Sequence, residues 1–262
     1  MPEPESGSEV LRENRGHVAI VTLNRPDARN AINAAVTAQM TAALDDIEAD
    51  KDAWVVVLTG AGDKAFCAGM DLKAFSSGEG GAVLNSQHGF AGIARRRFPK
   101  PIIAAVNGAA LAGGFEIVLS CDLVIAAEHA SFGIPEVKRG LIAAGGGLLR
   151  LPNRLPMAIA LEFGLTGDAV SAQRAYELGL VNKVVPAAAV MDEALALADR
   201  ITVNAPVAVR RSKQVMHDAA QVSEEEGWKV SEEASRVVFS APDAREGPIA
   251  FAEKRPPNWQ VE

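Results

Sequence analysis

The chain contains few cysteines, a deficit of basic residues and no long apolar run, and each shortage excludes a class of protein. Two cysteines, Cys67 and Cys121, occur in 262 residues, which argues against a disulfide-stabilised secreted domain and predicts free thiols in a reducing compartment. The 26 Lys and Arg residues are outnumbered by 33 Asp and Glu residues, whereas general binding to nucleic acid needs a basic face. No apolar run reaches membrane-spanning length. We therefore expect neither nucleic-acid nor membrane partners.

The first nine residues are polar and acidic and do not resemble a signal or transit peptide. We expect residues 1–14 to form a disordered acidic tail, and we expect the protein to be cytoplasmic. The remaining composition is ordinary for a globular chain, with 48% hydrophobic and 23% charged residues. The length suits one large α/β domain, alone or with a small appendage.

Segments of strand and helix character alternate along the first half of the chain. Buried runs typical of strands are separated by the expected helices Asn33–Glu48 and Leu111–Ser120. From about Leu155 onward the segments have helical periodicity, interrupted by an expected strand at Val181–Val185. This order predicts an α/β core followed by a helical C-terminal section. The expected strands of the first half are His17–Leu23, Trp54–Thr59, Ile102–Val106 and Leu123–Ala127.

Two segments rich in small residues follow expected strands, Phe66–Lys73 and Asn107–Glu116. Glycines there would let a ligand approach the backbone closely, because no Cβ stands in the way. The second segment leads into an expected helix, whose first N–H groups have no partner within the helix and carry partial positive charge. One N–H group from each segment could together hold an oxyanion. Either segment taken alone could equally be a tight turn with helix-packing glycines.

A third glycine-containing turn has to be weighed as a nucleotide site. Gly60-Ala61-Gly62-Asp63-Lys64-Ala65 follows a strand and fits the dinucleotide pattern G-x-G-x-x-A. That pattern needs a helix directly after the turn, but Ala68-Gly69 would interrupt it, and the next expected strand begins only at Ile102. We therefore favour the other reading, a turn without a nucleotide.

Two glutamates with apolar or small neighbours are candidates for proton transfer. Glu116 lies on the expected helix of the second glycine-rich segment, and Glu136 follows Phe132-Gly133-Ile134-Pro135. Burial raises the pKa of a carboxyl group, which can then act as general acid or base near neutral pH. Two such groups that converge on one water can divide these roles. A solvated surface charge is the alternative for each of them.

These pieces, in this order, resemble the crotonase family, whose best-known member is enoyl-CoA hydratase. The resemblance runs from about Val18 to Trp259 and is closest to the branch of enoyl-CoA hydratase and carnitinyl-CoA dehydratase. It implies an α/β fold, with residues 15–200 as a spiral of ββα turns and residues 201–262 as a C-terminal helical section. It also implies a homotrimer or a dimer of trimers. Further pieces that carry the resemblance are Asn24-Arg25-Pro26, Cys121-Asp122 and Phe251-x-Glu253-Lys254-Arg255.

Carried over residue by residue, the resemblance implies an enoyl-CoA hydratase site. The N–H groups of Met70 and Gly113 would form the oxyanion hole for the thioester carbonyl. Glu116 would be the base and Glu136 the proton donor to Cα. No cofactor is implied beyond the coenzyme A of the acyl-CoA substrate, and no metal-ligand cluster is apparent in the sequence. The implied contacts with coenzyme A come from Arg25, Cys67, Ala68, Lys73, Phe251 and Lys254.

Several alternatives to a general 2-enoyl-CoA hydratase stay open. A carnitinyl-CoA dehydratase would differ by preferring a cationic acyl group. A double-bond isomerase and a non-catalytic acyl-CoA-binding protein fit less well, because both glutamates are present. Cys67 as a thiol nucleophile lacks an adjacent base in the sequence. Two residues depart from the family pattern, namely Ala112, where many relatives have glycine, and Ala143, where many have proline.

Overall fold

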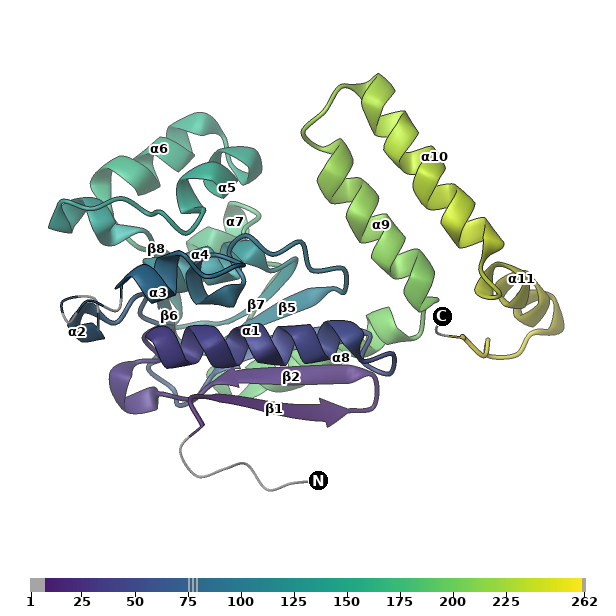
Figure 1. The fold of residues 1–262 in the computed structure, drawn as a ribbon, viewed down its shortest axis with the longest axis horizontal. Coiled ribbons are helices and arrows are strands. Elements are labelled where there is room, and N and C mark those ends of the chain that lie inside the picture. The colour runs from purple at the N-terminus through teal and green to yellow at the C-terminus, as the bar shows by residue number, and fades with distance from the viewer. Residues whose placement is uncertain (1–7, 75, 77, 79, 261–262) are drawn as a thin grey trace.

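The structure, a computed structural model, describes residues 8–74, 76, 78 and 80–260. Sheets and helices form one large body, and helices near the C-terminus project from it to one side (Figure 1). Two short 3-10 turns, η3 (Phe90–Gly92) and η4 (Pro135–Arg139), lie near the site described below. The α-helices are α1 (Ala34–Ala49), α2 (Leu72–Ala74), α3 (Gly80–Leu84), α4 (Gly113–Ser120), α5 (Gly147–Arg154), α6 (Met157–Thr166), α7 (Ala172–Glu177), α8 (Val190–Thr202), α9 (Pro206–Ala219), α10 (Glu224–Ser240) and α11 (Asp243–Glu253).

The larger sheet has the strand order β1-β2-β3-β5-β7-β10 within the described residues. β1 pairs antiparallel with β2, and the other neighbouring pairs are parallel. The central strands β3 and β5 are buried along their whole length, as expected for parallel strands covered on both faces. The strands are β1 (Val10–Arg15), β2 (Val18–Leu23), β3 (Val55–Gly60), β5 (Ile102–Val106), β7 (Leu123–Ala127) and β10 (Lys183–Val185).

The smaller sheet explains how the chain winds. Its strands β4 (Ala65–Cys67), β6 (Ala109–Leu111), β8 (Ser131–Gly133) and β9 (Val170–Ser171) lie in that order. Three times in succession the chain passes from a strand of the larger sheet to a strand of the smaller sheet and then into helical structure, at β3-β4-α2, β5-β6-α4 and β7-β8-η4. The expected spiral of ββα turns is therefore confirmed.

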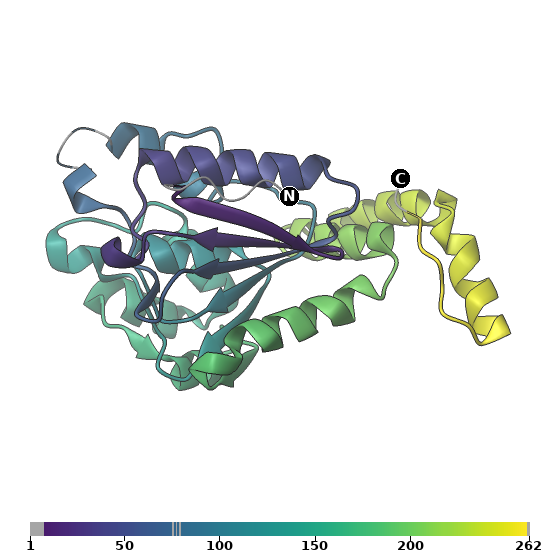
Figure 2. The same cartoon turned by 90° about the horizontal axis from the view of Figure 1, so that it is seen from below.

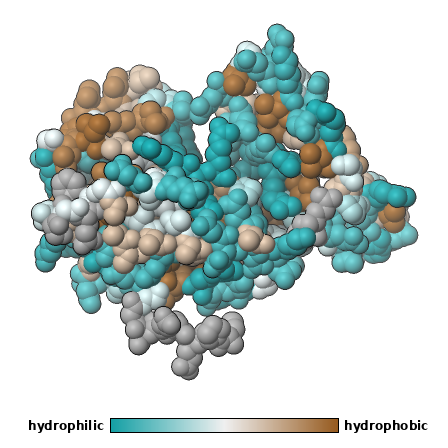
Figure 3. All heavy atoms as spheres, in the orientation of Figure 1, coloured by the Kyte–Doolittle hydropathy of each residue, from teal (hydrophilic) through white to brown (hydrophobic). Residues whose placement is uncertain are grey.

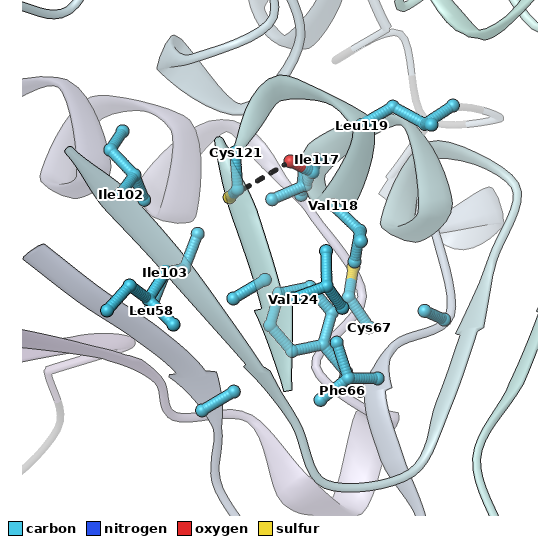
Figure 4. Close-up of a cluster of buried hydrophobic side chains, with 14 of the residues drawn as sticks. Leu58, Phe66, Cys67, Ile102, Ile103, Ile117, Val118, Leu119, Cys121 and Val124 are labelled. Atoms are coloured by element: carbon cyan, nitrogen blue, oxygen red, sulfur yellow. Dashed lines mark hydrogen bonds between the residues drawn. The ribbon is translucent and has the colours of Figure 1, made fainter. Parts of the chain in front are cut away.

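Helices cover both faces of the larger sheet. α1 lies on one face and α8 on the other (Figure 2). α1 begins where the sequence predicts, because the Asn33 side chain accepts a 2.8 Å hydrogen bond from the Val36 N–H and caps the helix. Apolar side chains fill the space between the sheets and α4 and enclose both thiols, with Cys121 donating to the Ile117 carbonyl (Figure 4).

The prediction for the N-terminus was wrong in part. The disordered tail expected over residues 1–14 does not extend that far, because β1 begins at Val10 and pairs in register with β2. Val10 is buried, and the Gln39 side chain accepts hydrogen bonds from the N–H groups of Glu9 and Val10. These long-range contacts outweigh the polar character of the local sequence. Residues 1–7 of that prediction lie outside the described residues.

The sequence did not predict the short helices α2 and α3, nor the longer helices α5 and α11; the last two have a common feature. Each contains a proline, Pro152 in α5 and Pro248 in α11, and α5 also begins among glycines, which lowers helix propensity. Packing of buried side chains such as Leu151 and Ala250 stabilises these helices instead. The helix expected from Leu155 begins only at Met157.

The C-terminal helices are held to the core at Asp122, which precedes β7. Lys213 on α9 donates to Asp122 Oδ2 at 2.7 Å and to the Lys100 carbonyl at 2.8 Å. His217 Nε2 lies 3.0 Å from Asp122 Oδ1. α9 then packs along α10 (Figure 1). Among the described residues, no helix is both long and apolar enough to cross a membrane.

The junction between β6 and α4 contains a strained residue. Ala112 has φ 52° and ψ −130°, a combination that glycine adopts far more readily than a residue with a Cβ. Its N–H donates to the Gly133 carbonyl at 2.9 Å, and its own carbonyl accepts from Phe115 and Glu116 at the start of α4. The alanine noted as a departure from the family pattern therefore occupies a backbone position that favours glycine.

We expect Ala112→Gly to stabilise the protein. Relief of the strain should exceed the added entropy of the unfolded chain and raise the free energy of unfolding by about 1 kcal/mol. Ala42→Gly, at an exposed position in the middle of α1, should lower it by about 1 kcal/mol. Urea unfolding at a fixed protein concentration measures both. Equal destabilisation by the two variants would show that Ala112 is not strained.

Candidate active site

Two turns that leave the smaller sheet meet at one point. β4 leads through Gly69 to Met70, and β6 leads through Ala112 to Gly113 at the start of α4. A Cβ on Gly69, which has φ +95°, would lie 2.8 Å from the Ala112 Cβ and 3.1 Å from the Gly113 nitrogen. Only glycine allows so close an approach in this conformation. The structure thus brings together the backbones of the two residues predicted to form an oxyanion hole.

The first turn of α4 is packed tightly on both sides. A Cβ on Gly114 would collide with the Cys67 carbonyl, and a Cβ on Gly113 would collide with the Phe90 ring of η3. Because Gly113 is the first residue of α4, its N–H has no partner within the helix and carries part of the positive end of the helix dipole. This N–H is therefore suited to stabilise a negative charge.

The turn at Met70 is held by an ion pair. Arg25 Nη1 lies 3.0 Å from Asp71 Oδ2 and donates to the Ala31 carbonyl at 2.5 Å. Ile32 donates to the Gly69 carbonyl at 2.8 Å, and Asp71 donates back to the Ile32 carbonyl at 2.9 Å. Although burial acts to raise it, the pKa of Asp71 is held below its ordinary value, chiefly by its hydrogen bond from Arg25. Arg25 thus positions the Met70 backbone.

Glu116 is buried in the first turn of α4, with 3% of its surface exposed. The Gly147 N–H donates to Glu116 Oε1 at 2.8 Å. Burial raises the pKa of Glu116 to about 7 and the negative charge of Glu136 adds to this rise, whereas the N–H group of Gly147 and the Arg150 guanidinium oppose it. Of the two candidate glutamates, Glu116 is therefore the one that the fold buries, and the alternative of a solvated surface charge does not apply to it.

Glu136, on η4, is half-buried and close enough to Glu116 for its charge to act on it. Its Oε2 atom is buried without a hydrogen-bond partner among the described residues, and burial raises the pKa of the carboxyl. The same side chain lines a groove of about 230 Å³ between η4, α5 and α6. The other residues that line this groove are Ile134, Val137, Ile142, Ala143, Leu148, Leu151, Pro152, Met157, Ala160, Leu161, Gly164 and Leu165.

Of the residues predicted to contact coenzyme A, Arg25 is engaged at the Met70 turn by Asp71 and the Ala31 carbonyl, and the others fall into two groups. Cys67, Ala68 and Lys73 lie on or just after β4, beside the Met70 turn, and Lys73 is exposed. Phe251, 85% exposed, and Lys254 belong to the end of α11, at the opposite end of the molecule from α2 (Figures 1 and 2). Within one chain the structure does not bring these two residues to Glu116.

Two alternative interpretations of the sequence are excluded by the geometry. Gly60 ends β3 and the chain enters β4 at Ala65, so no helix follows the turn that fits the dinucleotide pattern, and a pyrophosphate would lack its helix N-terminus. Burial raises the pKa of the Cys67 thiol to about 12, so this group would be almost entirely protonated at neutral pH and a poor nucleophile.

Sequence reasoning missed the partner of Glu116. The turn Gly145-Gly146-Gly147 supplies the hydrogen bond to its carboxyl, and a Cβ on Gly145 would lie 2.5 Å from Glu116 Oε2. Three consecutive glycines were the available signal, but their distance of some thirty positions from Glu116 hid the contact. Arg150, whose charge acts on Glu116, was missed for the same reason.

Comparisons with known proteins identify the family of the chain. The family described as enoyl-CoA hydratase/isomerase matches residues 13–262. Enoyl-CoA hydratase EchA19 of Mycobacterium tuberculosis is 42% identical and is aligned over 99% of both chains. Carnitinyl-CoA dehydratase of Proteus mirabilis is 43% identical over 94% of this chain and 96% of its own.

A solved structure shows the same fold. The crystal structure of an enoyl-CoA hydratase from Mycobacterium tuberculosis superposes with a TM-score of 0.93 and 49% identity, and it covers 97% of this chain and 99% of its own. The chain is therefore an enzyme of the enoyl-CoA hydratase/isomerase family, the crotonases.

Proposed function

We propose that the protein adds water reversibly across the double bond of a 2-enoyl-CoA thioester. The observation that carries this proposal is the buried Glu116 carboxyl, which interacts with Glu136 and lies on the helix that begins at Gly113. Two titratable carboxyls beside two converging backbone turns match what hydration requires, since one carboxyl can remove a proton and the other can supply one. The names of the relatives agree with this class of reaction.

Each step uses a group of the described chain. The thioester oxygen accepts hydrogen bonds from the N–H groups of Met70 and Gly113, which draws electrons from the conjugated system and leaves Cβ electrophilic. Water attacks Cβ while Glu116 takes one of its protons, and the negative charge develops on the thioester oxygen. Glu136 then delivers a proton to Cα. One C–O and one C–H bond form, while the C=C π bond and one O–H bond of water break. Transfer of the proton from Glu116 back to Glu136 through solvent restores both groups, so water is the only co-reactant.

Hydrogen bonding supports this assignment of the two roles. Glu116 Oε1 accepts from the Gly147 N–H, which favours the ionised form that a base needs. Glu136 Oε2 is buried and has no hydrogen-bond partner among the described residues, which disfavours its ionised form and suits a proton donor.

The groove beside Glu136 favours an alkyl acyl group. Glu136 is the charged residue among those that line it, and the rest are apolar or glycine. Apolar side chains also gather on the surface over α5 and α6 (Figure 3). A cationic acyl group, as in a carnitinyl-CoA dehydratase, would be better served by aromatic rings or further carboxylates, so this activity is the second candidate, carried by the similarity to enzymes of that name.

The α11 residues support an assembly of several copies. Phe251 and Lys254 lie far from Glu116 of their own chain (Figure 1), so contact with coenzyme A requires that they reach the site of a neighbouring copy. Large apolar side chains on the projecting helices, among them Met216, Trp228 and Phe239, are exposed, and burial of such surface favours association. A homotrimer, alone or paired, accounts for both observations.

We expect Glu116→Gln and Glu136→Gln each to lower kcat for crotonyl-CoA by roughly 10²- to 10⁴-fold, because each removes a proton-transfer group. The loss of the enoyl-thioester absorbance measures the rate. Glu128→Gln, at an exposed position, is the matched control and should retain the activity of the unsubstituted protein. Full activity in either Glu116→Gln or Glu136→Gln would refute the proposed roles.

The pKa of Glu116 sets the expected pH dependence. A base must be ionised, and burial raises the pKa of Glu116 to about 7, so the acidic limb of kcat/KM should lie near pH 7, with a fall of about tenfold per pH unit well below it. Initial rates measured across this range with crotonyl-CoA test this expectation. A fall that begins only near 4.5, the ordinary carboxyl value, would contradict it.

The lining of the groove predicts the acyl preference. We expect kcat/KM for straight-chain 2-enoyl-CoA of about six to eight carbons to exceed that for crotonobetainyl-CoA by at least about tenfold, because the cation would lose its hydration against apolar side chains. Parallel rates with the two substrates measure this ratio. A preference for crotonobetainyl-CoA would establish the second candidate instead.

A further inference from the structure

Arg150 lies on the opposite side of the Gly145–Gly147 turn from Glu116. Its Nη2 donates to the Ala94 carbonyl at 2.5 Å, and its Nη1 lies 3.4 Å from the Gly145 carbonyl. None of the ion pairs formed among the described residues includes it. A guanidinium that is largely removed from water without a paired carboxylate is costly, so its retention there calls for a function.

The turn itself is shaped by both charged groups. A Cβ on Gly145 would lie 2.5 Å from Glu116 Oε2, and a Cβ on Gly147 would lie 3.2 Å from Glu116 Oε1. A Cβ on Gly146, which has φ +107°, would collide with Arg150 Nη1. The three glycines therefore separate a carboxyl group from a guanidinium group by little more than the thickness of one peptide chain.

The hydrogen bond from Arg150 Nη2 to the Ala94 carbonyl reaches a second segment of the site. Ala94 lies just beyond Ile93, the residue that caps the η3 segment, and the Phe90 ring of η3 packs over Gly113. Arg150 thus connects the turn that binds Glu116 with the segment that covers the predicted oxyanion hole. The Arg150 side chain therefore holds both segments in place.

The charged groups around Glu116 also indicate that Arg150 acts on this carboxyl. The charged groups that act on Glu116 are Glu136 on η4, which disfavours the carboxylate, and Arg150 on α5, which favours it. Arg154, one turn further along α5, donates to the Cys121 carbonyl at 3.1 Å and has no such action on Glu116. Arg150 and Arg154 are therefore two half-buried arginines of one helix, of which only Arg150 acts on the charge of Glu116.

We propose that Arg150 is a positioning residue, which acts through the Gly145–Gly147 turn to hold the Glu116 carboxyl in place and to stabilise its negative charge. This inference depends on the proposed function only in that the proposed function names the reaction in which Glu116 takes part. It assigns to Arg150 no contact with the substrate.

The first test compares three variants by their pH profiles with crotonyl-CoA. Arg150→Met should shift the acidic limb of kcat/KM to higher pH. For a shift of one pH unit, its loss of activity relative to the unsubstituted protein should be about tenfold greater at pH 6 than at pH 9. Arg150→Lys retains the charge and should keep the limb near its original pH, although a single ammonium group cannot span both carbonyls and kcat should fall. Arg154→Met should lower the melting temperature without moving the limb.

The second test does not depend on activity. An infrared pH titration follows the carboxyl stretch of protonated Glu116, which is assigned by its absence in Glu116→Gln. The midpoint should rise in Arg150→Met and stay in Arg154→Met. An unchanged midpoint in a folded Arg150→Met protein would overturn the inference, as would an equal shift in Arg154→Met. If the unsubstituted protein is inactive on all enoyl-CoA substrates but Arg150→Met still shifts the midpoint, the role of Arg150 is upheld and the proposed hydration is refuted.

Discussion

The carboxyl group of Glu116 is buried inside the protein, and the arrangement of the surrounding backbone follows from keeping it there. A carboxylate in apolar surroundings takes up a proton unless hydrogen bonds and positive charge offset its lost hydration. The Gly147 N–H and the Arg150 guanidinium supply part of that compensation, and burial still raises the pKa to about 7. The group is thereby poised to gain or lose a proton at neutral pH, which is the property that a hydration site needs.

Glycine makes this arrangement possible, because the site is formed by chain segments that approach each other more closely than side chains would allow. Gly114 faces the Cys67 carbonyl, Gly145 faces Glu116, and Gly146 faces Arg150. Backbone held in this way is rigid, so its N–H groups are oriented before the substrate arrives. Ala112 is the exception, since its Cβ occupies a backbone conformation that favours glycine and stores strain next to the predicted oxyanion hole.

The projecting helices have a different physical basis from the core. They are attached by a few polar contacts around Asp122, such as the 2.7 Å bond from Lys213, and they expose large apolar side chains such as Trp228 and Phe251. The core is stabilised by burial within one chain, whereas such exposed apolar surface is suited to burial against other chains. The core therefore contains the candidate site, whereas the projecting helices carry this exposed apolar surface.

The sequence by itself determined the strands and helices with strong periodicity and the two glycine-rich segments after β3 and β5, but not the short strands β4 and β6 that open these segments. β5 and β7 have the bounds that their apolar runs predict, and α1 begins at its Asn33 cap. It also singled out Glu116, because a glutamate on an otherwise apolar helix is conspicuous. β1, α5 and α11 were decided only by tertiary packing, which overrode acidic or proline-containing local sequence. The pairing of Glu116 with Gly147 and Arg150 was likewise decided only in three dimensions, since hydrogen bonds and charge act through distance in space and leave no periodic trace along a chain.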